Sequence, residues 1–579
     1  GPHGFYWFQL SPASTGAAAV VAAPQRLPEL PLARTIDRVL AGRPLAALLT
    51  ALPAWLRSRR WFGAKARRIR AISLRDVIPL PETDDLEARL CLFEIEYVEG
   101  EPDVYVLPLA LADAVRAERL AQESPGSEIA SLPDGRVLYD AFVDPRTGPA
   151  LLSLLDRGRR VHGSAGSLGG VRTRAFRSVR GSARDRLPVA PIRAEQSNTS
   201  VIFGDRLILK LYRRVEPGVN PDFEVGRLLT EHDFAHTPPV AGALEYRPTG
   251  GDSITLGILQ GYVPNESDAW SYTLDSVDQA YERALALNET PAVQSPSVAR
   301  LLAVGREGLS PDVVQWIGGY LESARLLGVR TAEMHRALAT SSDDPAFRPE
   351  AINSFFQRSI YQGIRTQLRE TFSLLSRRRD LVPADEQAAV DAALRLEGPL
   401  LERLKQILAG PIGGRRIRIH GDYHAGQVLW TGSDFVIIDF EGEPGRPLGE
   451  RRLKRSPLRD VAGMLRSFHY AAYGTLLTDG LASATRPEDV PRLQPWARLW
   501  YESVAATFLR AYLDALDGFD LLPTVASQLV TLLDSMLLQK VLYEVVYELN
   551  NRPTWTSIPL RGLLELAEAP DSTEPPRLG

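Results

Sequence analysis

The segment from Ile419 to Glu441 constrains the fold of this chain more than any other part of its sequence. It reads IHGDYHAGQVLWTGSDFVIIDFE, with two apolar runs around a Gly-containing turn. This pattern predicts two short strands joined by a hairpin. Polar residues flank the hairpin on both sides, namely His420, Asp422, His424 and Gln427 before it and Asp439 and Glu441 after it.

These residue types in this order match the needs of phosphoryl transfer from a nucleotide. That reaction requires a group that accepts the hydroxyl proton and oxygen ligands for a divalent metal. Asp422 on the loop is the candidate catalytic base, while the amide oxygen of Gln427 and the carboxylate of Asp439 are candidate Mg²⁺ ligands. A loop with turn-forming Asp and Gly residues is the structural alternative.

An upstream strand pair, QSNTSVIFGDRLILKLYRR, supplies a candidate nucleotide site. Lys210 lies on one face of the second strand, where a lysine could neutralise nucleotide phosphates. No GxGxxG precedes it, but hydroxyls and backbone N–H groups of the turn Gln196 to Ser200 could contact phosphate oxygens. Glu224, at the start of the next predicted helix, is the candidate ion-pair partner of Lys210. A solvent-facing lysine and a glutamate stabilised by the helix dipole are the alternatives.

These segments resemble the aminoglycoside phosphotransferase and choline-kinase superfamily, and most closely the maltokinases. The resemblance implies an α+β, bilobal, eukaryotic-protein-kinase-like fold with an N-terminal cap subdomain and a largely helical C-lobe. It also implies ATP and Mg²⁺ as cofactors and maltose as acceptor. In addition it assigns nucleotide contacts to Gln196, Ser197, Ser200, Lys210 and Glu224, and places a backbone hinge for adenine at Gln260 to Val263.

A helical segment near the end of the chain carries the candidate acceptor face. Lys540, Tyr543, Glu544 and Tyr547 recur at helical spacing within KVLYEVVYELNNRPTW, so they share one face. The segment resembles the maltose-binding helix of maltokinases. An exposed stripe with a Lys540–Glu544 ion pair is the alternative. His424 could contact the acceptor or brace its own loop, and both interpretations stay open.

The order of patterns along the chain suggests four parts. We expect a remnant and linker at residues 1–30, a cap subdomain at 31–110, a small lobe that binds the ATP phosphates at 111–264, and the helical C-lobe at 265–579. The Gly, Ser and Arg-rich stretch 157–186 reads mostly as loop, with one short strand near Thr173 to Val179. The opening GPHGFYWFQL resembles the last strand of trehalose synthases, which suggests a trehalose synthase fused to or associated with this chain.

Composition excludes several classes of protein. The net charge is −4, from 67 basic and 71 acidic residues, so no overall basic field favours nucleic acid. No apolar run reaches the roughly 18 to 20 residues that span a bilayer, and the single cysteine, Cys91, excludes an internal disulfide. We therefore expect a cytoplasmic protein that binds neither membrane nor nucleic acid. The sequence leaves the oligomeric state open.

Three hypotheses of function follow. The first is ATP-dependent phosphorylation of maltose to maltose 1-phosphate, in trehalose and α-glucan (glycogen) metabolism. The second keeps the chemistry and changes the acceptor to an aminosugar, an aminoglycoside, choline or another small alcohol. The third is a non-catalytic module attached to trehalose synthase. Asp422, Gln427, Asp439 and Lys210 together favour an active enzyme, because the reaction depends on each of them.

Overall fold

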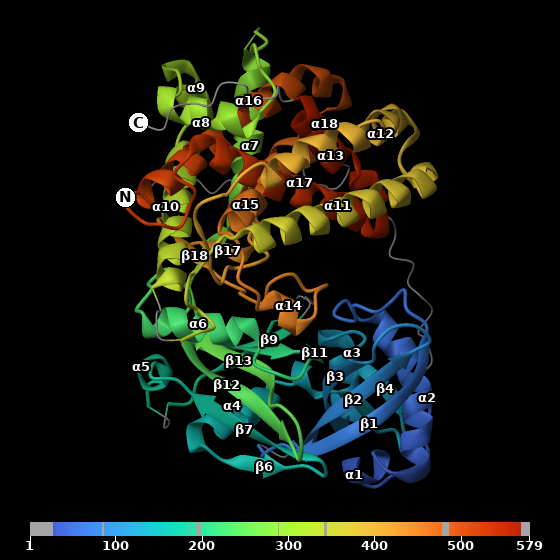
Figure 1. The fold of residues 1–579 in the computed structure, drawn as a ribbon. Coiled ribbons are helices and arrows are strands. Elements are labelled where there is room, and N and C mark those ends of the chain that lie inside the picture. Colours follow the sequence, from blue (N-terminus) through green and yellow to red (C-terminus); the bar gives the residue numbers. More distant parts are fainter. Residues whose placement is uncertain are drawn as a thin grey trace, which may run out of the picture.

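The computed structural model describes residues 27–83, 86–182, 185–192, 198–287, 289–340, 344–477 and 486–568. The opening segment that resembles a trehalose synthase strand lies outside these residues, and so do Gln196 and Ser197. Two large sheets lie at one end of the molecule, and most of the helices after residue 269 lie at the other (Figure 1). The predicted β-rich N-terminal half and helical C-terminal half are confirmed.

The first sheet is antiparallel, with strand order β1-β2-β3-β5-β4 and the short β11 paired to β3. The alternation that predicts these strands reflects a sheet whose inner face packs on α1 and α2. Trp61 and Phe62 pack there against Tyr105. The elements are α1 (Ile36–Val39), α2 (Gly42–Ser58), β1 (Ile69–Pro79), β2 (Ala88–Tyr97), β3 (Asp103–Ala112), α3 (Ala114–Glu123), β4 (Glu128–Ser131), β5 (Val137–Asp140) and β11 (Arg214–Val215).

The second sheet is also antiparallel and has the order β6-β7-β12-β13-β10-β9-β8. Its central strands β10, β12 and β13 bury apolar side chains in a second core. The elements are α4 (Thr147–Arg157), β6 (Arg160–His162), β7 (Gly166–Arg172), α5 (Phe176–Arg180), β8 (Val189–Pro191), β9 (Asn198–Phe203), β10 (Leu207–Tyr212), α6 (Pro221–Glu231), β12 (Val240–Pro248) and β13 (Ile254–Gly261).

The prediction that residues 157–186 are mostly loop is wrong in part. Strands β6 and β7 occupy much of this stretch, and the expected strand near Thr173 to Val179 is largely the helix α5. The reason is visible at Gly170, where an added Cβ would lie 2.7 Å from the backbone of Leu155 in α4. Glycine lets helix and strand approach this closely, so β7 lacks the large apolar side chains that normally mark a buried strand.

The C-terminal part is a helical assembly around a third core, with two small sheets, β14-β17-β18 and β15-β16. Its helices are α7 (Ala269–Ala286), α8 (Val298–Glu307), α9 (Pro311–Ile317), α10 (Tyr320–Ala339), α11 (Ser354–Arg377), α12 (Gln387–Leu394), α13 (Glu397–Leu404), α14 (Leu448–Arg451), α15 (Leu458–Leu477), α16 (Val490–Ala515), α17 (Ala526–Asn551) and α18 (Ser557–Glu568). Its strands are β14 (Ser267–Asp268), β15 (Glu350–Ala351), β16 (Arg415–Arg416), β17 (Val428–Trp430) and β18 (Phe435–Ile437).

The hairpin β17–β18 and helix α14 lie on the side of the helical part that faces the sheets (Figure 1). Strands β17 and β18 pair antiparallel with Val428 opposite Ile437, which confirms the predicted hairpin. Among the helices of the described ranges, none combines the length and apolar character needed to cross a bilayer. The exact domain boundaries stay predictions.

Candidate active site

A buried carboxylate fixes the loop that carries Asp422. Asp460, near the start of α15, accepts hydrogen bonds from the backbone N–H groups of His420 at 2.8 Å and Gly421 at 2.9 Å. Its Oδ2 also lies 3.1 Å from Nε2 of His335. Burial alone would raise the pKa of Asp460, but the hydrogen bonds from His335 and the Gly421 N–H and the charges of the nearby histidines lower it. The loop backbone is thus held from α15, and Asp422 projects from a braced turn.

The loop that carries Asp439 lies directly beside the Asp422 loop. His420 donates from Nε2 to the carbonyl oxygen of Ile438 at 2.8 Å. The N–H of Ile438 in turn donates to the carbonyl oxygen of Gln427 at 3.0 Å. Asp439 has a φ of 68°, a left-handed conformation that non-glycine residues rarely adopt. This tight turn directs the chain away from β18 and brings Gln427 and Asp439 to one end of the hairpin.

Lys210 on β10 lies among three carboxylates. Its Nζ contacts Asp439, lies 2.5 Å from Glu441 and lies 3.3 Å from Asp222 on α6. Burial alone would lower the pKa of Lys210, but the three negative charges hold it well above its ordinary value. Burial raises the pKa of Glu441 to about 7, and although Lys210 opposes this rise, Asp439 and Asp222 add to it. We call these four residues the lysine cluster.

Asp222 on α6 connects strand β10 of the second sheet to the Asp439 loop. It accepts hydrogen bonds from the hydroxyl of Tyr212 at 3.1 Å and from the backbone N–H of Phe440 at 3.0 Å. Asn220 caps the helix by accepting the N–H of Asp222 at 2.9 Å, which fixes the first turn of α6. The sequence interpretation missed Asp222, although its place in that capped first turn was a signal.

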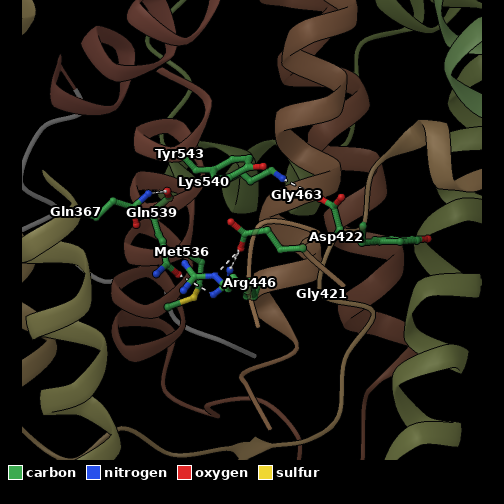
Figure 2. A pocket seen from close by; sticks show the side chains of 12 residues that line it. Gln367, Gly421, Asp422, Arg446, Gly463, Met536, Gln539, Lys540 and Tyr543 are labelled. Carbon is green, nitrogen blue, oxygen red and sulfur yellow. Dashed lines mark hydrogen bonds and ion pairs between the residues drawn. The ribbon is translucent and has the colours of Figure 1, made fainter. Parts of the chain in front are cut away.

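A pocket opens where Asp422 meets α17, and Figure 2 shows Lys540 pointing toward Asp422. Its empty volume is about 420 Å³, including the open mouth. Nζ of Lys540 lies 3.3 Å from Oδ1 of Asp422. Glu443 accepts from Arg446 at 2.8 Å and from Arg459 at 3.0 Å. The lining residues are Gln367, Gly421, Asp422, Tyr423, Glu443, Arg446, Arg459, Gly463, Met536, Gln539, Lys540 and Tyr543.

This geometry agrees with the comparison to known proteins. Residues 188–522, more than half of the chain, match the model of the phosphotransferase enzyme family. The chain belongs to the phosphotransferase enzyme family. Residues 55–144 match a second model, the maltokinase N-terminal cap domain. The predicted kinase-like fold with an N-terminal cap is confirmed.

Curated relatives of this phosphotransferase are named as kinases of an aminosugar. A glucosamine kinase from Mycolicibacterium smegmatis (strain ATCC 700084 / mc(2)155) is 26% identical over 397 residues, which cover 66% of this chain and 80% of that protein. A glucosamine kinase from Streptacidiphilus jiangxiensis is 26% identical over 382 residues, covering 64% and 72%.

Solved structures show the same fold at lower identity. A glucosamine kinase in crystal form B matches with a TM-score of 0.56 and 20% identity, covering 87% of this chain and 96% of that chain. Another, in complex with glucosamine, ADP and inorganic phosphate, matches with a TM-score of 0.54 and 20% identity, covering 90% and 98%.

The predicted ion pair between Glu224 and Lys210 is wrong. Glu224 of this phosphotransferase accepts from Arg418 at 2.8 Å and from Arg452 at 2.7 and 2.9 Å. Glu224 is two residues beyond Asp222, about 200° around the helix, so the two carboxylates point in opposite directions. Burial alone would raise the pKa of Glu224, but the two arginines lower it. Asp222 contacts Lys210 instead, and Glu224 ties α6 to the helical lobe.

The four residues of the predicted acceptor face on α17 separate in the structure. Lys540 and Tyr543 line the pocket. Glu544 does not, because it forms a buried ion pair with Arg466 of α15 at 2.8 Å. Tyr547 is 44% exposed and stacks on Tyr543 with ring centroids 6.3 Å apart, beside the pocket. Glu544 therefore does not line this pocket, and its contact with an acceptor stays a prediction.

Of the remaining predicted residues, Ser200 lies within strand β9 and not in the expected turn, whereas Gln260, Val263 and His424 lie on the strand end and loops expected of them. Ser200 on β9 is opposite Lys210 in the strand register, and Gln260 is a buried residue near the end of β13. Val263 follows that strand on the segment that leads into the helical lobe. His424 accepts the N–H of Gly426 at 3.1 Å and caps a short turn, so in this structure it braces its loop.

The lysine cluster fits a divalent cation. Carboxylate oxygens of Asp222, Asp439 and Glu441 lie within 4.8 Å of one another. Carboxylate oxygens are ligands that Mg²⁺ prefers, and Gln427 adds an amide at the same end of the hairpin. The pocket lined by Asp422 and Lys540, which we call the acceptor pocket after its expected role, also contains Glu443 and Arg446, which the sequence interpretation missed. Both follow the DFE segment closely in GEPGR, so charged residues next to the motif were the available signal.

Proposed function

We propose that this chain transfers the γ-phosphoryl group of ATP to a sugar hydroxyl, and that the sugar is maltose, giving maltose 1-phosphate. Membership of the phosphotransferase enzyme family and the maltokinase-type cap support this proposal. The observation that carries it is the position of Asp422. It lines a pocket that contains several charged side chains, while its loop is hydrogen-bonded beside the lysine cluster. A sugar hydroxyl in the pocket would therefore lie next to a proton acceptor, Asp422, and near the lysine cluster, where the nucleotide phosphates would bind.

On the phosphate side, Lys210 would neutralise oxygens of the nucleotide phosphates. Asp439 and Gln427 would hold Mg²⁺, which supplies positive charge that stabilises the transferring group. Asn198 donates to Glu441 at 2.6 Å, which keeps the cluster oriented. The backbone after β13, around Gln260 and Val263, would contact adenine, and Ser200 would lie near the phosphates.

On the acceptor side, Asp422 would take the proton of the anomeric hydroxyl while that oxygen forms a bond to the γ-phosphorus. The bond between the γ-phosphorus and the bridging oxygen breaks, and ADP leaves with the electron pair. Lys540 orients the Asp422 carboxylate through their 3.3 Å contact. Tyr543 offers an aromatic surface for the apolar face of a sugar ring.

The charges in the pocket favour a neutral sugar over the aminosugar named for the relatives. Binding an ammonium group requires a carboxylate that is not already neutralised. Both carboxylates among the described lining residues face cations, Asp422 beside Lys540 and Glu443 between Arg446 and Arg459. Glucosamine is the second candidate acceptor because two curated relatives are glucosamine kinases.

A coupled ADP-release assay tests the proposal. Mg-ATP is supplied with maltose, glucose, glucosamine, trehalose, choline or kanamycin, and Asp422→Asn is assayed beside the original chain. Asp233→Asn is the matched control, because that carboxylate is 89% exposed and Asn tolerates its positive φ. We expect maltose-dependent ADP release that Asp422→Asn lowers by about 10² to 10⁴-fold and that Asp233→Asn leaves unchanged.

Other outcomes separate the alternatives. Turnover with glucosamine alone would keep the transfer chemistry and reject maltose. Absence of turnover with every acceptor would favour a non-catalytic module.

A further inference from the structure

A second charged pocket lies at the start of α11, beside β15, β16 and the segment 452–455. Its empty volume is about 820 Å³, including the open mouth. It shares no lining residue with the acceptor pocket, and it contains none of the lysine cluster. We call it the arginine pocket. Its lining residues are Ala346, Glu350, Phe355, Phe356, Ser359, Arg416, Arg418, Arg452, Leu453, Lys454 and Arg455.

Positive charge exceeds negative charge in this lining. Five cationic side chains, Arg416, Arg418, Arg452, Lys454 and Arg455, line the pocket together with one carboxylate, Glu350. Glu350 lies 2.5 Å from Arg416 and 2.6 Å from Lys454. Arg418 and Arg452 share Glu224, which lies just outside the lining. Each of the two carboxylates, Glu350 and Glu224, is therefore already paired with two of these cationic side chains.

Among the residues that the structure describes, the Arg455 guanidinium has no hydrogen-bond acceptor or ion-pair partner, and only its backbone is bonded, to Ile417. Burial and then the positive charges of Arg459 and Arg446 lower its pKa to about 10. Arg418 is only 2% exposed, and its Nη2 has no hydrogen-bond partner within the described ranges. Nε of Arg416 is also buried and has no hydrogen-bond partner among the described residues. These two nitrogens are covered by protein, so oxygen atoms of a ligand would reach the more accessible cationic groups of the lining, of which the Arg455 guanidinium still has no acceptor among the described residues.

We propose that the arginine pocket binds the phosphate group of a small phosphorylated molecule, at a site separate from the catalytic one. Phosphate suits these side chains because guanidinium groups present paired N–H donors that match its oxygens. It also carries more acceptor oxygens and more charge than a single carboxylate. The pocket is far larger than one anion, so the body of a small molecule can enter with its phosphate. Phe355, which is 79% exposed, gives that body an apolar surface.

The arginine pocket lies next to the ion pairs that join helix α6 to the helical lobe. Arg418 and Arg452 line the pocket and also hold Glu224 of α6, the helix whose Asp222 contacts Lys210. A phosphate here would therefore share two arginines with the ion pair that joins α6 to the helical lobe. This inference does not rest on the proposed function, because binding is measured without turnover.

Calorimetric titration of the full chain at low ionic strength tests the site. The probes are inorganic phosphate and glucose 6-phosphate, with acetate and glucose as controls. We expect both phosphates to bind and both controls to fail. Arg455→Gln should weaken phosphate binding by about tenfold or more, because it removes a charged donor. Glu350→Gln should tighten binding, because it removes a carboxylate that competes for Arg416 and Lys454.

Lys210→Met distinguishes this site from the nucleotide site and should leave phosphate binding unchanged. The proposal is overturned if Lys210→Met abolishes binding while Arg455→Gln retains it, since the phosphate would then occupy the nucleotide site. Acetate binding as tight as phosphate also overturns it, as does the absence of binding by either phosphate. Should Arg455→Gln fail to fold by circular dichroism, Arg416→Gln carries the same expectation at a side chain that is 29% exposed.

Discussion

The lysine cluster and the acceptor pocket lie on neighbouring loops but have opposite charge balances. In the cluster, three carboxylates surround the single ammonium of Lys210. Among the described residues that line the acceptor pocket, Arg446, Arg459 and Lys540 outnumber Asp422 and Glu443. An excess of carboxylate can accept a further cation, whereas the pocket has no carboxylate left for a cationic ligand. This difference is what the proposed transfer from a metal–nucleotide complex to a neutral sugar requires.

The two regions also differ in how they are assembled. The cluster takes Lys210 from β10, Asp222 from α6, and Asp439 and Glu441 from the segment after β18. Its geometry therefore depends on contact between the sheet lobe and the helical lobe. The acceptor pocket is built entirely from elements after residue 366. We therefore expect substitutions at the contact between the two lobes to change the geometry of the lysine cluster more than that of the acceptor pocket.

The largest expected effect is on stability, from Glu224→Gln. This change leaves Arg418, which is 2% exposed, without its carboxylate. Removing one partner of a buried ion pair costs about 3 to 5 kcal/mol of unfolding free energy. Chemical denaturation with urea measures it, and Glu231→Gln on the exposed end of α6 is the control. A loss below about 1 kcal/mol, the range of surface pairs, would show that Glu224 does not hold the lobes together.

A somewhat smaller effect is expected on catalysis from Lys210→Met. Loss of one electrostatic contact to the transition state lowers kcat by about 10² to 10³-fold. Removing the ammonium also leaves three carboxylates facing one another, so Mg²⁺ should raise the melting temperature of this variant more than that of the original chain. Lys405→Met, at an exposed side chain, is the control. Equal stabilisation of both chains by Mg²⁺ would mean that the carboxylates do not form the metal site.

Local sequence patterns predicted the elements and the motif loops. The hairpin β17–β18 follows from two apolar runs around TGSD, and Lys210 follows from alternation along β10. Both features depend only on residues close in sequence. Strand β7 was not predicted, because its close packing against α4 requires glycine at positions where a buried strand normally has apolar side chains.

Contacts between distant segments could not be predicted in the same way. Helical spacing put Glu544 on the same face as Lys540, but the partner of Glu544 is Arg466, on another helix. Likewise, Glu224 forms an ion pair with Arg418, which lies 194 residues away in the sequence. Spacing fixes which side chains share a helix face, and packing decides which charge lies opposite each of them. The roles assigned to individual site residues stay predictions until they are measured.

The smallest expected effect belongs to the acceptor side, from Lys540→Met. This change keeps most of the side-chain length and removes one charged donor beside Asp422, so the KM for maltose should rise about tenfold, the equivalent of one charged hydrogen bond. The KM for ATP should stay unchanged, because the lysine cluster contains no residue of α17. Initial-rate kinetics with each substrate varied in turn measure both constants, and Lys405→Met again serves as control. A rise in the KM for ATP would show that the two regions act as one site and that their opposite charge balances do not separate nucleotide from acceptor.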